Sequence, residues 1–277
     1  MKRIVTVQDI SCIGKCSLTV ALPIISAMGT ETAVIPTAVL SAHTAFDGFV
    51  FTDLTDRIEP IADHWQKENI AFDAVYTGYL GSYEQINIVE SLVKRFRADG
   101  TKVIVDPVMG DNGRLYSGFD RRFAARMAQL CAEADIILPN YTEACLILIE
   151  PYDGATCSEQ KAREMLPRLT ETGTGTAVIT GVTGDDGGYG AVGYSGASGE
   201  YFSAFCERIG TSYHGTGDIF ASAFVGALMR DKSMQSSLEI AVGYTAECIK
   251  ATVSDPNARW YGVNFEAALP WLINKIM

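Results

Sequence analysis

The feature that most constrains the fold of this chain is a regular alternation of short apolar runs with spacers of helical length. The runs comprise residues 4–7, 74–78, 103–107, 136–140 and 177–181, with one or two more strands expected between residues 32 and 40. Apolar runs that end in Gly, Pro or a polar residue are typical of strands buried on both faces of a parallel sheet. The spacers, such as residues 83–99 and 121–134, carry helical patterning. This β-α-β alternation predicts a doubly wound α/β fold.

The pattern changes after residue 183. Residues 187–194 and 200–207 predict two antiparallel strands joined by a Gly/Ser-rich turn, and helices are expected near residues 217–230, 235–253 and 264–276. Antiparallel strands commonly extend the edge of a parallel sheet. Because no linker, low-complexity segment or repeat interrupts the 277 residues, we expect a single domain over residues 1–277. Its expected architecture is three-layer α/β/α, with a mostly parallel central sheet and antiparallel edge strands.

Charge and cysteine content narrow the range of partners. Thirty-three acidic against twenty-two basic residues give a net charge of −11, which repels nucleic acids and anionic lipids at long range. Gln8 and Asp9 interrupt the N-terminal apolar run, so we expect no signal peptide, and no stretch approaches the ~18 apolar residues of a membrane helix. Seven scattered cysteines without a C-x-x-C pair indicate reduced thiols. We therefore expect a cytoplasmic protein with small-molecule ligands and without nucleic-acid or membrane partners.

Polar residues stand at the ends of the predicted strands. They are Asp9, Asp106, Asn140 and Thr180. In open α/β sheets ligands bind beyond the carboxyl ends of the strands. These four side chains are therefore expected to cluster where chemistry takes place.

The segment Gly215-Thr216-Gly217-Asp218 is the strongest local signal for chemistry. Its glycines permit a tight turn and close approach to a ligand, and it stands where a helix is expected to begin. Free N–H groups and the dipole at a helix start stabilise an anion such as a phosphoryl group in transfer. Asp218 could accept a proton from a hydroxyl there, and the same dipole predicts a low pKa for it. Read locally, the segment is equally compatible with a Gly-rich N-cap that has no catalytic role.

Five further segments, in matching order along the chain, resemble motifs of the pyridoxal (vitamin B6) kinases of the ribokinase-like superfamily. Gly215-Thr216-Gly217-Asp218 itself resembles the anion-hole signature of that superfamily. The other segments are Ser41-Ala42-His43-Thr44, Thr77-Gly78-Tyr79, Asp106-Pro107-Val108-Met109-Gly110-Asp111, Asn140-Tyr141-Thr142-Glu143, which fits Asn-x-x-Glu, and Val178-Ile179-Thr180. The resemblance implies a ribokinase-like fold and transfer of phosphate from ATP to the 5′-hydroxyl of a B6 vitamer.

The resemblance also implies a role for each matched residue. Asp218 would be the base, and Gly215, Thr216 and Gly217 would hold the γ-phosphate. Asn140 and Glu143 would organise Mg²⁺, chiefly through water. Asp106, Asp111 and Thr180 would contact the ATP phosphates and their cations, which could include a monovalent ion. The pyridine pocket would be lined by Asp9, Ser11, His43, Thr44, Tyr79 and His214. The resemblance further implies a homodimer.

Two positions depart from the pattern of the pyridoxal kinases. Asp9 stands where those kinases have Ser, and His214 stands where a small apolar residue is usual. An Asp at the first position is closer to the hydroxymethylpyrimidine kinases of thiamine synthesis, although their Gly-Gly-Ala-Gly-Ile-Gln run is absent here. A hydroxymethylpyrimidine (phosphate) kinase is therefore the alternative function, followed by a non-catalytic vitamin-binding protein on the same fold.

Overall fold

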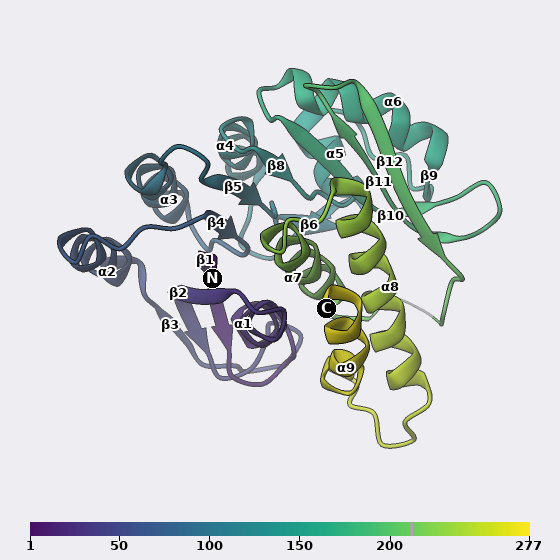
Figure 1. Ribbon diagram of the computed structural model, residues 1–277, viewed down its shortest axis with the longest axis horizontal. Helices are drawn as coiled ribbons and strands as arrows, with labels where there is room; N and C mark the ends of the chain where they lie inside the picture. Colours follow the sequence, from purple (N-terminus) through teal and green to yellow (C-terminus); the bar gives the residue numbers. More distant parts are fainter. Residues whose placement is uncertain (211–212) are drawn as a thin grey trace.

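The computed structural model of this chain describes residues 1–210 and 213–277, and it is built around one large sheet with helices on both faces (Figure 1). The strands of the sheet are β1 (Arg3–Ser11), β2 (Glu31–Leu40), β3 (Phe51–Asp53), β4 (Ala74–Thr77), β5 (Lys102–Val105), β8 (Ile136–Ile137), β9 (Cys157–Ser158), β10 (Thr176–Thr183), β11 (Tyr189–Ser195) and β12 (Glu200–Cys206). A separate hairpin is formed by β6 (Gly110–Asp111) and β7 (Arg114–Leu115).

The strand order is β12-β11-β10-β8-β5-β4-β1-β2-β3, with β9 paired to β10. Strands β2, β1, β4, β5, β8 and β10 run parallel. The pairs β2–β3, β10–β11 and β11–β12 are antiparallel. The expectation of a mostly parallel sheet with antiparallel edges is therefore confirmed, including the hairpin after residue 183.

Nine helices are present in the described residues, and they divide between the two faces of the sheet (Figure 1). One face is covered by α2 (Thr55–Lys67), α3 (Tyr83–Phe96), α4 (Arg121–Ala132), α5 (Tyr141–Leu148) and α6 (Glu159–Glu171). The other is covered by α1 (Leu18–Ala27), α7 (Thr216–Met229), α8 (Met234–Val253) and α9 (Phe265–Ile276). The three layers match the expected α/β/α architecture.

The two hydrophobic cores follow directly from the alternation of side chains along each strand. In β1, Val5 and Val7 pack on the α2–α6 face, whereas Ile4 packs on the α7 face. In β4, Val75 and Tyr76 divide in the same way. Because both faces of these central strands are covered, each side chain should be apolar or should form its hydrogen bonds within the protein. This explains why the runs in the sequence are predominantly apolar.

Some elements differ from the expectation. The run at residues 136–140 forms only the two-residue strand β8 (Ile136–Ile137). Pro139 has no N–H for the sheet, and Asn140 is already the N-cap of α5. Residues 32–40 lie in a single strand, which the expectation of one or two strands allowed, and that strand includes Pro36. Strand β3 pairs only with Ala38, Val39 and Leu40, so β2 has a free edge at the proline.

Two expectations about the environment of the chain can be compared with the structure. All seven cysteines are free thiols. None of the helices in residues 1–210 and 213–277 combines the length and the hydropathy of a membrane-spanning segment.

Candidate active site

The carboxyl ends of the parallel strands bring the polar residues of distant segments to one edge of the sheet. Asp9 lies near the end of β1, and Asp106 follows β5, donating its N–H to the carbonyl of Thr77 at the end of β4. Asn140 follows β8 and forms an isolated parallel bridge with Thr180 in β10. The clustering predicted from the strand ends is therefore present in the structure.

Helix α7 begins at this edge with a turn that only glycine adopts without strain. Gly215 has φ +80°, and a β-carbon placed on it would lie 2.2 Å from the carbonyl oxygen of Lys15. Within residues 1–210 and 213–277, no side chain caps the helix. A β-carbon on Gly217 would meet no atom of these residues within 4 Å. The start of α7 therefore combines uncapped N–H groups with open space, as an anion-binding turn requires.

Asp218 lies in the first turn of α7 and is half-buried. Its pKa is raised to about 6, chiefly by desolvation and further by the nearby charge of Asp9, while a hydrogen bond from the backbone N–H of Ser17 opposes the shift. The prediction of a low pKa from the helix dipole was therefore wrong. Burial beside a second carboxyl group outweighs a dipole effect that is typically below ~1 kcal/mol.

A second carboxyl group faces this turn from β1. Asp9 is buried, accepts a hydrogen bond of 3.0 Å from the hydroxyl of Ser11, and has a pKa raised mainly by desolvation. Its charge also raises the pKa of Tyr79 and of Cys16, after desolvation in both cases. Asp9 is thus hydrogen-bonded to Ser11, and its charge acts on both Tyr79 and Asp218. The thiol of Cys16, with a pKa raised to about 12, stays protonated there.

His43 is held by the backbone at both ring nitrogens. Its Nδ1 accepts from the N–H of Ala45 at 3.1 Å, so Nε2 carries the proton and donates to the carbonyl of Tyr261 at 3.0 Å. The ring also packs against Gly14, where an added β-carbon would lie 2.3 Å from it. His43 therefore joins three loops that border the site. Burial lowers its pKa, so the ring is neutral near pH 7.

An aromatic cluster surrounds His43 at the rim of the site. His214, which is exposed, lies 5.3 Å from His43 between ring centroids, and Phe46 lies 5.1 Å away. Trp260 is 62% exposed and packs on Phe46 at 4.6 Å. Thr44 is exposed beside this cluster. Phe46, Trp260 and Tyr261 were not predicted as site residues, because nothing in the sequence connects residue 260 with residue 43.

Asn140 and Glu143 form a reciprocal capping box at the start of α5. The carboxylate of Glu143 accepts from the N–H of Asn140 and of Met109 at 2.9 Å each, and the amide of Asn140 donates to the carbonyl of Gly110 at 2.8 Å. The pair therefore fixes the β6–β7 hairpin against α5. It also places a buried carboxylate beside Asp106.

The buried acidic residues at this end of the site have raised pKa values. Burial raises the pKa of Glu143 to about 7. Burial, together with the charges of Glu143 and Asp218, raises the pKa of Asp106 well above its ordinary range. The pKa of Tyr116 is also raised, first by desolvation and then by Glu143, Asp111, Asp106 and Asp218. The charges of four carboxyl groups thus act on Tyr116, a partly exposed residue that sequence reasoning missed.

The positions of these carboxyl groups show what kind of divalent cation site they could form. Within the described parts of the chain, no three His, Cys, Asp or Glu side chains stand close enough to enclose a metal on their own. Asp111 is exposed and accepts from Asn112, and both oxygens of Glu143 accept backbone N–H groups. The set fits Mg²⁺ that keeps most of its water and binds substrate phosphate, because that ion needs few protein ligands and is favoured by concentrated negative charge.

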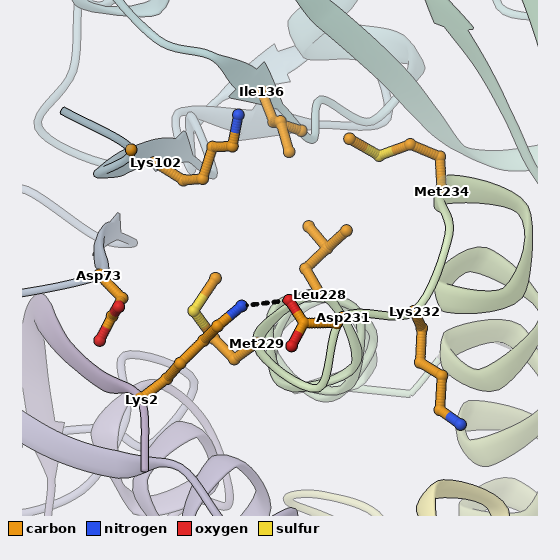
Figure 2. A pocket seen from close by; sticks show the side chains of 10 residues that line it. Lys2, Asp73, Lys102, Ile136, Leu228, Met229, Asp231, Lys232 and Met234 are labelled. Carbon is orange, nitrogen blue, oxygen red and sulfur yellow. Dashed lines mark hydrogen bonds and ion pairs between the residues drawn. The ribbon is translucent and has the colours of Figure 1, made fainter.

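The structure also contains a cavity that lies away from the predicted site residues. Its volume is about 390 Å³, and it lies at the opposite, amino-terminal edge of the sheet (Figure 2). Lys2, which pairs there with Asp231 at 2.5 Å, precedes β1, and Lys102 begins β5. Because none of the predicted site residues lines this cavity, its size does not identify it as the place of chemistry.

Comparison with known proteins shows the family to which the chain belongs. A family model described as phosphomethylpyrimidine kinase matches residues 24–259. The crystal structure of a "putative phosphomethylpyrimidine kinase" from Bacteroides thetaiotaomicron is 39% identical, covers 98% of this chain and 93% of its own, and superposes with a TM-score of 0.93. A second crystal form of that protein, with pyridoxal, gives a TM-score of 0.90.

Named pyridoxal kinases are also among the relatives. The pyridoxal kinase of Lactobacillus plantarum is 31% identical over 99% of this chain and 97% of its own, with a TM-score of 0.90. The pyridoxal kinase of Dictyostelium discoideum is 25% identical, over 83% of this chain and 79% of its own. The chain therefore belongs to the phosphomethylpyrimidine kinase family, with pyridoxal kinases of the ribokinase-like fold among its relatives.

Proposed function

We propose that this chain is an ATP-dependent kinase that phosphorylates the 5′-hydroxyl of pyridoxal, pyridoxine or pyridoxamine. The observation that carries the proposal is the position of Asp218. It lies in the first turn of a helix for which the described residues provide no side-chain cap, and it is near enough to Asp9 for the charge of one to raise the pKa of the other. A carboxylate there can receive the proton of an alcohol while the turn holds the phosphoryl group. The pyridoxal in the Bacteroides relative supports the choice of alcohol.

In the proposed reaction the oxygen of the vitamin's 5′-hydroxyl attacks the γ-phosphorus of ATP. Its proton passes to the carboxylate of Asp218, the bond to the β-phosphate oxygen breaks, and ADP leaves. The N–H groups of Gly215, Thr216 and Gly217 would stabilise the negative charge on the γ-phosphoryl oxygens. Because the pKa of Asp218 is about 6, the group is largely ionised near pH 7 and is a stronger base than an exposed Asp.

Mg²⁺ fits the acidic end of the site. When bound there it would neutralise charge on the phosphates and orient them. Glu143 and Asn140 would hold its water ligands, while Asp106 and Asp111 would lie near the triphosphate. Thr180 would contact a nucleotide phosphate. A monovalent cation beside the phosphates is compatible with the same negative charge.

The vitamin pocket is proposed between β1, the end of β4 and the rim. Asp9 and Ser11 form its buried base, and Tyr79 forms a wall that stacks on Phe119 at 5.7 Å. Thr44 and His214 would line the mouth. His43 would act mainly by holding the three loops around that mouth, since both of its ring nitrogens already have partners.

A hydroxymethylpyrimidine or hydroxymethylpyrimidine-phosphate kinase is the second candidate. Two observations favour it: the description of the matching family model, and the acidic side chain of Asp9 where pyridoxal kinases have Ser. Hydroxymethylpyrimidine, like the B6 vitamers, carries a hydroxymethyl group on an aromatic nitrogen ring, so the same base and anion hole serve either alcohol. A non-catalytic vitamin-binding protein would not need the uncapped turn together with Asp218.

The decisive experiment is a parallel assay of ADP formation with MgATP and pyridoxal, pyridoxine, pyridoxamine or hydroxymethylpyrimidine. The proposal expects the highest kcat/KM with a B6 vitamer and formation of its 5′-phosphate. Turnover of hydroxymethylpyrimidine alone would support the second candidate. Tight vitamin binding without any turnover would support the binding protein.

The proposal also covers the number of domains, the cellular environment and the oligomeric state. One sheet with helices on both faces supports a single kinase domain over residues 1–277. Seven free thiols support a reducing, cytoplasmic environment. A homodimer is proposed from the resemblance to pyridoxal kinases, and sedimentation equilibrium of the purified chain tests it.

A further inference from the structure

The loop between β1 and α1 has a backbone conformation that its own residues disfavour. Lys15 and Ser17 both have φ +51°, in the left-handed region that residues other than glycine seldom adopt. Such residues persist where the surrounding structure imposes the conformation, and they are concentrated at functional sites. The contacts of Lys15 show what imposes the conformation here.

The backbone of Lys15 lies against the start of α7. A β-carbon on Gly215 would lie 2.2 Å from the carbonyl oxygen of Lys15, so the two backbones are in contact without a side chain between them. A shift of the loop at Lys15 would therefore either push the turn at Gly215 or leave space beside it. That turn is the one proposed to hold the γ-phosphate.

The side chain of Lys15 runs to a different helix. Its ammonium group donates to Asn264 Oδ1 at 3.1 Å and to Glu266 Oε2 at 2.9 Å. It also lies 5.9 Å from the centroid of the Phe265 ring. These three residues are the N-cap and the first residues of α9. Through its carbonyl and its ammonium group, Lys15 thus joins the start of α7 to the start of α9.

The segment that precedes α9 is itself anchored. The Asn264 carboxamide also donates to Asp255 at 2.8 Å, and the Asn264 N–H donates to Thr252 Oγ1 at 2.7 Å near the end of α8. A β-carbon on Gly262 would lie 2.7 Å from that of Lys15, so this segment packs closely on the loop. The anchor of Lys15 is therefore built from α8 and α9, which carry none of the predicted site residues.

An ordinary surface ion pair is the simpler explanation of these contacts. Such pairs contribute little to stability, and the side chain of Glu266 is 55% exposed. The Lys15 side chain, however, is only 19% exposed, has a second acceptor on Asn264 and extends from a disfavoured backbone conformation. A small displacement of groups that hold a reacting phosphate can lower the rate strongly. The contact should therefore affect the rate more than the stability.

We propose that Lys15 is a positioning residue for the anion-binding turn at Gly215. Its ammonium group, held by Asn264 and Glu266, fixes the backbone of the loop, and its carbonyl sets the position of Gly215. The start of α9 thereby takes part in placing the γ-phosphate. The role in phosphoryl transfer rests on the proposed function, whereas the structural link between the two helices does not.

Lys15→Met tests this inference, because it removes the charge and keeps most of the length of the side chain. We expect kcat to fall about tenfold, with KM for the alcohol and for ATP changed by less than about twofold. Glu266→Gln should lower kcat about threefold, since Asn264 still holds the ammonium group. The double variant should be no slower than Lys15→Met, because both changes act through one contact. Lys15→Arg keeps a charged donor and should retain at least about half of the wild-type kcat.

Lys250→Met is the matched control. Lys250 also pairs with a glutamate, Glu247, at 2.8 Å, but both residues of that pair lie on α8 itself. The substitution makes the same change in net charge and should leave kcat and both KM values unchanged. An equal fall of kcat in the two variants would show an effect of net charge and would overturn the role of Lys15.

Amide hydrogen exchange tests the structural link without any substrate. The N–H of Ile219 donates to the carbonyl of Gly215 at 3.0 Å, and the N–H of His43 donates to the carbonyl of Ile13 at 2.9 Å. Both should exchange faster in Lys15→Met than in the wild-type chain, and at the wild-type rate in Lys250→Met.

The two measurements separate this inference from the proposed function. If none of the four alcohols were phosphorylated, the proposed function would fail, while the exchange at Ile219 would still decide whether Lys15 supports the turn. Unchanged exchange would overturn the inference. A rise in KM for ATP with an unchanged kcat would also overturn it, because it would place the ammonium group of Lys15 on the nucleotide.

Discussion

The carbonyl oxygen of Lys15 occupies the place that a side chain on Gly215 would need, at 2.2 Å from an added β-carbon. The loop after β1 and the turn before α7 are thereby in direct backbone contact. The backbone N–H of Ser17, two residues further along that loop, lowers the pKa of Asp218 and so opposes the effect of burial. The proposed anion hole and base are therefore held by the same loop that borders the vitamin pocket.

Replacing the two glycines of this turn should have different effects. Gly215→Ala forces a non-glycine residue into positive φ against a backbone atom, so we expect the free energy of unfolding to fall by about 2 kcal/mol or more. We also expect kcat to fall about 100-fold, as when one oxyanion donor is lost. Urea unfolding and steady-state kinetics measure the two effects.

Gly217→Ala is the matched variant. Its methyl group would enter open space, so stability should be unchanged or slightly higher, because Ala favours a helix. If that space receives the γ-phosphate, kcat/KM for ATP should nevertheless fall. Full activity of Gly217→Ala would contradict the placement of the phosphate.

The raised pKa of Asp218 predicts a loss of activity at acidic pH in the pH–rate profile. The base must be ionised, so log kcat/KM for the alcohol should decline below an apparent pKa of about 6. Asp218→Asn should lower kcat by at least ~100-fold and abolish this limb. A pH–rate profile that is flat down to about pH 4.5 in the wild-type enzyme would contradict the assignment.

The same shift predicts the effect of Asp218 on stability. Because the folded state raises this pKa from 3.8 to about 6, it binds the proton more tightly than the unfolded chain. The stability contributed by Asp218 is therefore complete below pH 3.8 and declines as the pH rises through 6. Asp218→Asn should have a higher thermal midpoint than wild type at about pH 8, and the difference should vanish near about pH 4.

Much of the fold could be predicted from local sequence. The runs that became β1, β4, β5 and β10 are predominantly apolar because both faces of the sheet are covered. Strand β3 and the β6–β7 hairpin were not predicted, since two- or three-residue strands are defined by their partners rather than by their own composition.

The candidate site was predictable where a strand end or a single segment carries a local signal. Gly215 and Asp218 adjoin in sequence, and Asn140 and Glu143 form a local capping box. By contrast, the bond between His43 and Tyr261 spans 218 positions. Neither that bond nor the desolvation that raises the pKa of Asp218 leaves a local pattern.

His43 should affect binding more than chemistry. His43→Ala removes the bonds to Ala45 and Tyr261, so we expect KM for the vitamin to rise about fivefold or more with kcat changed less than about twofold. The exposed His64 on α2 provides the control, since His64→Ala should change neither constant. A fall in kcat without a change in KM would instead place His43 in the chemical step.

The pH dependence of stability gives a second measure of the same contacts. Burial lowers the pKa of His43 below 6.5, so the folded state disfavours its protonation. A proton on Nδ1 would also break the hydrogen bond from Ala45. Stability should therefore be full above pH 6.5 and decline as the pH falls towards the lowered pKa, and this decline should be smaller in His43→Ala.

Glu143 should determine how much Mg²⁺ the enzyme needs. Glu143→Gln removes the buried charge, and we expect the Mg²⁺ concentration for half-maximal activity to rise about 10- to 100-fold. Since the pKa of Glu143 is about 7, the wild-type requirement should fall as the pH is raised through that value, whereas that of Glu143→Gln should not.

The substitution also leaves one backbone donor at the hairpin without an acceptor, and a control must separate this effect from the loss of charge. Thr142→Val supplies it, because the hydroxyl of Thr142 accepts from the N–H of Gly113 at 2.9 Å and carries no charge. We expect both variants to lower the thermal midpoint, and only Glu143→Gln to change the Mg²⁺ dependence. An equal shift in the two variants would show that Glu143 acts by holding the β6–β7 hairpin and not through its charge.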